Sequence, residues 1–240
     1  MPRFFNAAIG EGEVTLFGED ALHLAKALRL KPGEHITVCD GKGNDYICTA
    51  LQVTPHLVTA QIIDFIPSIA EPPVPITLYQ ALCKGEKLEL IIQKAVELGA
   101  TQIVPVLTHR CVSRPEKAAL ERKLVRWQKI SAEAAKQSGR GIIPQIAQLL
   151  DFKEAITCMK KDAKAILFYE KATIPLGDAL RKSGEAISIM TGPEGGFEQS
   201  EIEYAQEHGV DICSLGPRIL RCETAPLCAL SLVAGVLEIL

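Results

Sequence analysis

The sequence lacks the excess of positive charge that marks many nucleic-acid-binding proteins. Its 240 residues carry a formal net charge of −3 at pH 7. No global cationic field therefore attracts a polyanion. Any nucleic-acid binding must come from a local basic patch, or from a large folded RNA that supplies much of the contact surface. The hydrophobic share of 48% is that of a globular chain, long enough for one large domain or two smaller ones.

Metal-binding and nucleophilic motifs are also missing. The eight cysteines form no C-x-x-C pair, and the five histidines are scattered along the chain. We interpret the cysteines as reduced cytosolic thiols and small core residues, and we predict no metal site. The spacing supports no Ser-His-Asp or Cys-His arrangement, so the sequence does not indicate a nucleophilic mechanism.

The sequence shows neither a signal peptide nor a membrane span. Residues 1–5, which read MPRFF, contain no apolar segment of the kind that a signal peptide needs. The run 225–240 is strongly apolar, but it contains Pro226 and Glu238 and is shorter than a bilayer span. We expect a cytoplasmic protein without membrane contact, in which this run forms a buried helix against the sheet or a second subunit.

Two glycine-containing turns near the C-terminal end carry the strongest signal. Residues 191–197 read TGPEGGF and follow the apolar run 186–190, and residues 215–225 read LGPRILRCETA and follow the run 210–213. Neither contains the dinucleotide fingerprint or the phosphate-binding P-loop. Loops at strand ends of an α/β sheet usually line ligand sites, so we predict one pocket, built mostly from backbone, for a ligand with little phosphate charge. A plain tight turn before a helix remains the alternative for the first loop.

The second turn also carries charged side chains. Arg218 and Arg221 lie three residues apart, and their guanidinium groups could grip phosphates or polarise a base carbonyl. The alternative is that Arg221 forms a structural ion pair with Glu223. Thr224 is in position to cap the last helix, with Pro226 in its first turn.

The chain divides at a proline-rich segment, residues 67–75. Before it, short β-branched runs separated by turns predict a small β-barrel over residues 1–70, interrupted by one helix over 19–30. After it, strands and helices alternate, which predicts an α/β domain with a parallel sheet over residues 74–240. One helix of that domain is expected over 174–182.

Arg110, Arg114 and Arg140 form a third group of cations. Arg110 follows the predicted strand 103–107, and Arg140 follows the helix that ends near residue 138. Loops after strands face the same edge of the sheet as the pocket, so these arginines predict a basic rim for a polyanion. A solvated surface is the alternative for each of them.

The order and spacing of these motifs resemble those of the bacterial 16S ribosomal RNA uridine-N3 methyltransferases, within the knotted SPOUT superfamily. The most specific pieces are the two glycine turns, 191–197 and 215–225. Supporting pieces are residues 1–5, His23 with Leu28 and Arg29, Lys84 with residues 97–99, and the stretch 133–140, which reads EAAKQSGR. The resemblance covers essentially the whole chain.

The resemblance implies a PUA-like RNA-binding barrel over residues 1–70 and a methyltransferase domain over residues 74–240 whose tail threads a loop to form a trefoil knot. It also implies a homodimer, 16S rRNA in the small ribosomal subunit as substrate, and the cofactor S-adenosylmethionine. The implied cofactor-binding residues are Leu167, Tyr169, Glu170, Thr191, Gly192, Pro193, Gly195, Gly196, Leu215, Gly216, Ile219, Leu220, Arg221 and Thr224.

The expected chemistry moves a methyl group to uracil N3, which loses a proton. Arg221 is the first candidate to stabilise the negative charge on the ring, and Glu194 or Glu223 either orients that arginine or accepts the proton. Arg3, Lys26 and Arg29 of the barrel would grip the RNA backbone. The alternatives are a methyltransferase acting on tRNA or on a ribose hydroxyl, a non-catalytic ribosome-assembly factor, and a metabolic nucleotide-binding enzyme.

Overall fold

The structure is a computed structural model that describes residues 3–5, 9–180 and 186–237. Met1, Pro2 and Glu238, which the sequence analysis used, lie outside the described residues, as does the end of the helix expected over 174–182. The chain forms two compact units, one of residues Met1–Glu71 and Ala135–Ile143, the other of Pro72–Ala134 and Pro144–Leu240. The division falls between Glu71 and Pro72, within the proline-rich segment.

A five-stranded sheet forms the first unit, with strand order β1-β3-β4-β5-β2. β1 runs parallel to β3, and the other neighbours are antiparallel. Alternate residues of the strands point into a core that includes Val14, Leu16, Ile36 and Val58. The strands are β1 Arg3–Phe5, β2 Glu13–Phe17, β3 His35–Cys39, β4 Asn44–Val53 and β5 Leu57–Pro67.

The helix expected over residues 19–30 is shorter and less regular than predicted. An α-helix, α1 Gly18–Leu22, continues into a π-helical turn, η1 His23–Ala27. The wider turn places Leu24 in the core, fully buried, and it leaves Arg29 in the left-handed region with φ 52°. The apolar period of the sequence indicated a helix correctly, but it does not distinguish α from π winding.

A buried ion pair joins two distant segments of the first unit. The Arg140 guanidinium, 2% exposed, donates to Glu71 from Nη2 at 2.6 Å. The same carboxylate accepts from the backbone N–H groups of Gly141, at 2.9 Å, and Ile142, at 3.0 Å. Glu71 therefore holds the segment 140–142 through one carboxylate.

Replacing Glu71 with glutamine should lower the free energy of unfolding by about 1.5 kcal/mol, because the amide still accepts hydrogen bonds but removes the negative charge that faces the Arg140 guanidinium. Urea unfolding of the whole chain, followed by circular dichroism, measures this. Glu11→Gln, at an exposed position of the same unit, is the matched control. Equal urea midpoints for Glu71→Gln and Glu11→Gln would contradict a stabilising role for the ion pair between Glu71 and Arg140.

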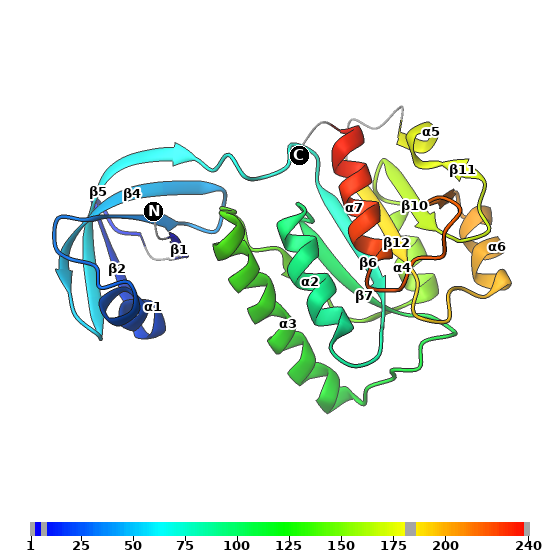
Figure 1. Cartoon of the computed structure of the whole chain (residues 1–240), viewed down its shortest axis with the longest axis horizontal. Helices are drawn as coiled ribbons and strands as arrows, with labels where there is room; N and C mark the ends of the chain where they lie inside the picture. The colour runs from blue at the N-terminus through cyan, green and yellow to red at the C-terminus, as the bar shows by residue number, and fades with distance from the viewer. Residues whose placement is uncertain (1–2, 6–8, 181–185, 238–240) are drawn as a thin grey trace. The chain divides into compact units, whose positions relative to one another are not determined.

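A parallel sheet forms the second unit, with strand order β11-β13-β10-β12-β6-β7-β8 and with β9 also paired to β7 (Figure 1). All of these pairs are parallel, as the sequence predicted. The strands are β6 Ile76–Ala81, β7 Gln102–Leu107, β8 Gln145–Ile146, β9 Leu150–Asp151, β10 Lys164–Phe168, β11 Ile174–Pro175, β12 Ile187–Thr191 and β13 Asp211–Ser214.

Among the described residues, the helices that accompany these strands are α2 Lys87–Glu97, α3 Lys117–Ser138, α4 Phe152–Met159, α5 Leu176–Leu180, α6 Gln199–Glu207 and α7 Ala225–Val236. α4 and α6 pack with the sheet in one apolar cluster, to which Phe152, Ile156 and Ile202 contribute. α7 lies against α2 and β12 (Figure 1). Within the described part of the chain, no helix combines the length and apolar character needed to cross a membrane.

Two local predictions for this unit differ from the structure. Ile174 and Pro175 form the short strand β11, so the helix expected from residue 174 begins only at Leu176. In addition, α4 was not predicted from the sequence. Its start carries a capping box, in which Asp151 accepts from the Glu154 N–H at 2.8 Å and Glu154 accepts from the Asp151 N–H at 2.9 Å. That D-x-x-E pattern was the signal that could have located it.

Candidate active site

A cleft of about 450 Å³ opens where three neighbouring strands of the parallel sheet end. β10 lies between β13 and β12, so the loops after these strands meet at one edge. The loop residues that line the cleft are Phe168, Tyr169, Glu170, Thr191, Gly192, Pro193, Glu194, Gly195, Gly196, Phe197, Leu215, Gly216, Arg218, Ile219, Leu220, Arg221 and Cys222. Two of these loops were predicted from the residues alone, and the third from the resemblance.

The loop 191–197 is compact because its glycines have no side chains. Gly196 has φ 67° and its N–H bonds to the carbonyl of Pro193 at 3.0 Å, which closes a tight turn. A Cβ on Gly192 would lie 3.1 Å from the ring of Phe197, and a Cβ on Gly195 would lie 3.1 Å from Cβ of Arg110. The turn therefore exposes main chain to the cleft while its outer side packs closely.

A buried pair of polar side chains anchors the start of this loop. The hydroxyl of Thr191 donates to Oε1 of Gln80 at 2.6 Å. Nε2 of Gln80 donates to the carbonyls of Ala81, at 3.0 Å, and Gly192, at 3.4 Å. Both side chains are almost fully buried, so β6 fixes the first glycine of the loop through hydrogen bonds that water cannot replace.

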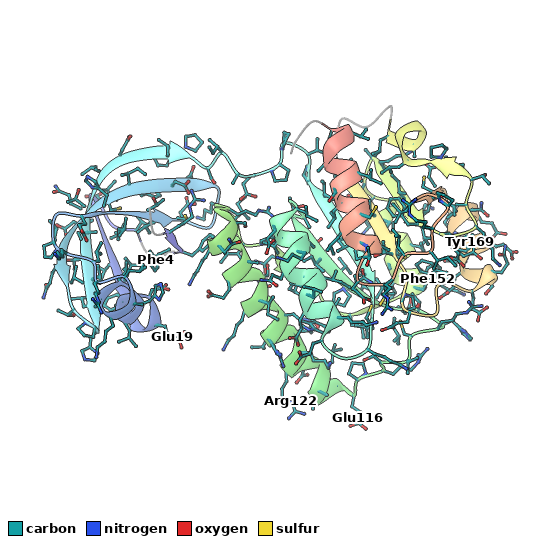
Figure 2. The ribbon with its side chains drawn as sticks, viewed as in Figure 1. Phe4, Glu19, Glu116, Arg122, Phe152 and Tyr169 are labelled. Atoms are coloured by element: carbon teal, nitrogen blue, oxygen red, sulfur yellow. The ribbon has the colours of Figure 1, made fainter. Side chains whose placement is uncertain are left out.

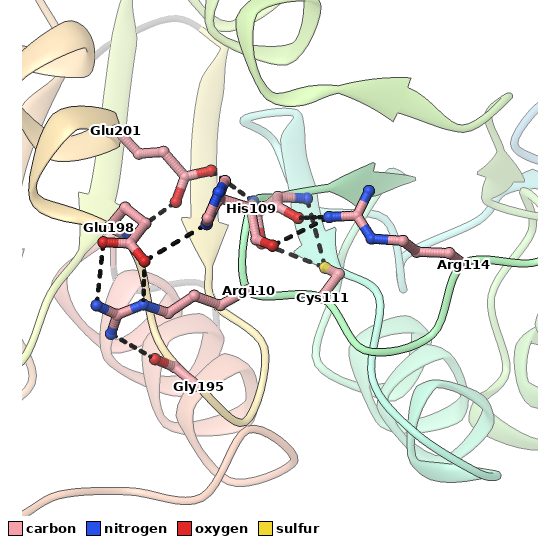
Figure 3. Close-up of polar contacts among 8 residues, drawn as sticks. His109, Arg110, Cys111, Arg114, Gly195, Glu198 and Glu201 are labelled. Atoms are coloured by element: carbon pink, nitrogen blue, oxygen red, sulfur yellow. Dashed lines mark hydrogen bonds and ion pairs between the residues drawn. The ribbon is translucent and has the colours of Figure 1, made fainter.

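Arg110 holds the other end of the loop (Figure 3). Its Nε and Nη2 donate to the two carboxylate oxygens of Glu198, at 2.9 and 3.1 Å, and its Nη1 donates to the carbonyl of Gly195 at 2.9 Å. This bidentate pair keeps the pKa of Glu198 below its usual range. Nη2 of Arg114 donates to the carbonyls of Thr108 and His109, so Arg110 and Arg114, two of the three arginines of the predicted basic rim, bond to the protein itself.

The loop after β13 carries the exposed cations. Gly216 has φ 103°, and the turn that it makes presents Arg218, Ile219 and Arg221 to solvent beside the cleft. Among the residues that the structure describes, neither arginine has a side-chain hydrogen bond or an ion pair. Their guanidinium groups are therefore available to a ligand.

Two predicted cofactor residues do not line the cleft. Leu167 lies fully buried within β10. Thr224 takes the N-cap position of α7, and its side chain makes no capping hydrogen bond there. Its backbone N–H bonds to the carbonyl of Arg221 at 2.8 Å, so it closes the turn that contains this arginine.

Lys87 is a cleft residue that the sequence analysis missed. Its Nζ lies 3.4 Å from Oε1 of Glu194, 3.3 Å from Oε2 of Glu223 and 3.6 Å from Sγ of Cys222. The ammonium thus connects the two loops whose carboxylates were predicted as catalytic. The residue precedes the others by more than a hundred positions, so no spacing pattern indicates this contact.

These contacts keep both carboxylates ionised. Partial burial alone would raise the pKa of Glu194, but hydrogen bonds from the Lys84 N–H and from Lys87 outweigh it and hold the pKa below its usual range. The thiol of Cys222 donates to Glu223 at 3.2 Å and, together with Lys87, lowers the pKa of Glu223. Glu223 in turn contributes most to raising the pKa of Lys87 to about 12.

The cations predicted in the first unit differ in their surroundings. Arg3 forms an ion pair with Asp45, which is buried. Lys26 and Arg29 are exposed on the helical segment α1–η1 and its exit. Arg140 is buried against Glu71, as described above. Of these four, only Lys26 and Arg29 present an exposed side chain to solvent.

The structure thus combines a parallel α/β sheet, whose cleft is lined largely by main chain, with a β unit that carries the exposed cations Lys26 and Arg29. A family profile described as RNA methyltransferase domain matches residues 70–234, and one described as RNA methyltransferase PUA domain matches residues 16–63. The chain is thus an RNA methyltransferase.

Individual relatives support this membership over nearly the full length. The ribosomal RNA small subunit methyltransferase E of Bacillus subtilis is 34% identical over 94% of this chain and 91% of its own. That of Synechocystis is 37% identical over 95% of this chain and 75% of its own. A crystal structure of the Neisseria gonorrhoeae enzyme bound to S-adenosyl methionine is 34% identical, with TM-score 0.88 over 98% of both chains. The chain therefore belongs to the family named ribosomal RNA small subunit methyltransferase E, which confirms the predicted family as methyltransferases of small-subunit rRNA.

Proposed function

We propose that this protein transfers a methyl group from S-adenosylmethionine to N3 of a specific uridine of 16S rRNA in the small ribosomal subunit. The observation that carries the proposal is the cleft, where two glycine turns place main chain beside the exposed guanidinium of Arg221. The relatives' names support the class of RNA, and the Neisseria structure supports the cofactor. The motif resemblance supplies the uridine and its N3 atom.

The cleft fits an adenosyl cofactor. Its volume lies in the range of small-molecule sites, about 300–1,000 Å³. The glycines at 192, 195 and 196 leave main chain exposed, which suits a ligand with polar edges and no phosphate, and Tyr169, Ile219 and Leu220 supply apolar surface. Bound there, the cofactor supplies an electrophilic methyl group on a sulfonium.

Side chains at the rim of the cleft would activate the uracil for methylation. Uracil N3 lies on the pairing edge of the base, so the target uridine must be unpaired or turned out of its stack. Loss of the N3 proton leaves negative charge on the ring oxygens, and Arg221 stabilises that charge. Because Lys87 and other donors lower the pKa of Glu194 and of Glu223, both are weak proton acceptors, and among the described residues both pair with Lys87 and not with Arg221.

Lys87→Met should move the acid limb of the pH profile of kcat/KM to higher pH. Without the ammonium, the pKa of Glu194 rises, so this carboxylate is protonated, and its contribution lost, at a higher pH as the pH falls. Rates measured across the acid range test this. Lys94→Met is the control, since Lys94 pairs with Glu97 of the same helix. If the acid limb of Lys87→Met lies at the same pH as that of the wild type, Lys87 does not control the protonation of Glu194.

The first unit would bind RNA as a PUA-like barrel, and its exposed cations Lys26 and Arg29 carry most of this part of the proposal. Arg3, Arg110 and Arg140 are engaged by Asp45, Glu198 and Glu71, so each is expected to contribute less to RNA binding. Arg114 is exposed and does not line the cleft, and its guanidinium donates to the carbonyls of Thr108 and His109. The proposal also includes a trefoil knot formed by the C-terminal segment and a cytoplasmic homodimer, both implied by the motif resemblance.

Arg29→Ala should weaken RNA binding and reduce the slope of log affinity against log salt by about 0.9, the value for one lost phosphate contact on a duplex. Affinity titrations with small-subunit rRNA at several salt concentrations measure the slope. Arg122→Ala is the control, because Arg122 lies exposed on α3 (Figure 2) and belongs to no predicted contact. Equal slopes for wild type and Arg29→Ala would remove this residue from the interface.

A tritiated methyl-transfer assay on small ribosomal subunits tests the activity itself. We expect label in the RNA that depends on the protein and on the cofactor. A non-catalytic assembly factor would bind the subunits without transferring label. Absence of transfer to subunits, together with absence of cofactor binding by calorimetry, would overturn the proposal.

A further inference from the structure

Three metal-ligand atoms from separate segments meet at the wall of the cleft. Cys83 follows β6, Glu194 belongs to the first glycine turn, and Cys222 follows Arg221. The two Sγ atoms and a carboxylate oxygen lie within 4.8 Å of one another. Both cysteines are buried, with exposed fractions of 4% and 6%. The proposed methyl transfer uses neither thiol, so this cluster is left without a role.

We propose that Cys83, Glu194 and Cys222 bind a thiophilic divalent cation of the zinc class. Zinc takes thiolates at about 2.3 Å and carboxylate oxygens at about 2.0–2.2 Å, so tetrahedral ligand atoms lie about 3.5–3.8 Å apart. Contraction by at most about 1.3 Å brings the three atoms, which lie within 4.8 Å of one another, to that spacing. Two soft sulfur ligands select zinc, cadmium or cobalt over magnesium, and water takes the fourth position.

The Lys87 ammonium already contacts two of the three proposed ligand residues. The Lys87 ammonium lies 3.6 Å from Sγ of Cys222 and 3.4 Å from Oε1 of Glu194. Its long side chain is 35% exposed, so the ammonium can move into solvent when an ion enters. Lys87 and a metal ion therefore compete for the same donors, which gives the site a direct test.

The charges and atoms balance for this exchange. Binding breaks two S–H bonds, forms two sulfur–metal bonds and releases two protons to solvent, while Glu194 contributes its carboxylate as it stands. The site gains the two charges of the ion and loses two protons, so its net charge is unchanged. No oxidant or reductant is needed.

Occupation of the site would also alter the cleft. Glu194 would exchange its contacts with Lys84 and Lys87 for the ion, and Cys222 would be fixed beside Arg221. Lower cofactor affinity in the metal-loaded protein is the expected consequence, and this part of the inference rests on the proposed function.

Cobalt(II) added to the reduced, metal-free protein tests the site without the cofactor. We expect thiolate-to-cobalt charge-transfer absorption that saturates at one ion per chain. Cys83→Ser and Cys222→Ser should each lower the cobalt affinity by about 100-fold or more, because each removes a direct ligand. Lys87→Met should raise it, because the competing ammonium is gone. Cys228→Ser, the same substitution at a cysteine in α7, should leave the titration unchanged.

No charge-transfer absorption, or titrations that match the wild type in both ligand variants, would overturn the site. If Cys83→Ser does not fold, Glu194→Gln replaces it as the test variant, and its cobalt affinity is expected to fall by about tenfold or more. An unchanged affinity in Glu194→Gln and a lower one in Lys87→Met would also count against it. Calorimetry of S-adenosylmethionine with the metal-free protein reports separately on the proposed function, so the two failures are distinguishable.

Discussion

Replacing Arg221 with alanine is expected to slow methyl transfer by about 100- to 1,000-fold, the usual effect of removing a group that stabilises charge developing in the transition state. The structure supports this because Arg221 lies at the cleft and has no side-chain partner among the described residues. Its guanidinium therefore needs to break no contact before it meets the base. Single-turnover methyl transfer at saturating cofactor and RNA measures the change.

Cofactor binding should survive in Arg221→Ala, because the charge that this guanidinium is proposed to stabilise develops on the uracil. Arg218→Ala is the matched control, since Arg218 is also exposed and lies in the same loop, three residues earlier. Its rate at saturating RNA should stay close to that of the wild type. A wild-type rate in Arg221→Ala, or equal losses in the two variants, would contradict the electrostatic role.

Gly192→Val is expected to weaken S-adenosylmethionine binding by about 10- to 100-fold, the equivalent of the 1–3 kcal/mol that overpacking typically costs. A Cβ at this position lies 3.1 Å from the ring of Phe197, which is buried and has little room to move. The valine would therefore displace the main chain of the turn that is proposed to hold the cofactor. Calorimetric titration of the variant gives the affinity.

The control for this change is Gly177→Val in α5, where an added Cβ meets no atom within 4 Å. That variant should bind the cofactor as the wild type does. Thermal unfolding of both variants separates a local effect from loss of the fold. Cofactor affinity in folded Gly192→Val equal to that of Gly177→Val would place the ligand elsewhere.

Much of the cleft was predictable because its main features are local. Glycine turns after apolar strands were visible in the sequence, and parallel strand order brings their ends together. Lys87 and Cys83 were not predictable, since their contacts with residues 194, 222 and 223 depend on how β6 and α2 pack beside the C-terminal loops. Single-sequence periodicity carries no information on such pairings.

The ion pairs of two arginines could not be predicted from residue type. Arg110 and Arg140 were predicted as part of a rim for RNA, because loops after strands face the same edge of the sheet as the pocket. In the structure each also meets a carboxylate far away in the sequence, Glu198 or Glu71. These pairings position the glycine turn and the segment 140–142, and only tertiary structure reveals them.

The exact secondary structure of two short segments could not be predicted from the sequence either. The apolar period located a helix near residues 19–30, but whether a turn closes with α or π hydrogen bonds depends on packing against the β sheet of its unit. Similarly, β11 forms because β13 lies beside it, although Ile174 and Pro175 continue an apparent helical pattern.

Mass spectrometry of nucleosides from small-subunit RNA tests the central claim most directly. Unmodified small subunits would be incubated with the protein and S-adenosylmethionine carrying a deuterated methyl group, and the RNA then digested. The account predicts the heavy methyl group on a single nucleoside, 3-methyluridine. Heavy label on a ribose or on another base, or no label in RNA from subunits that bind the protein, would contradict it.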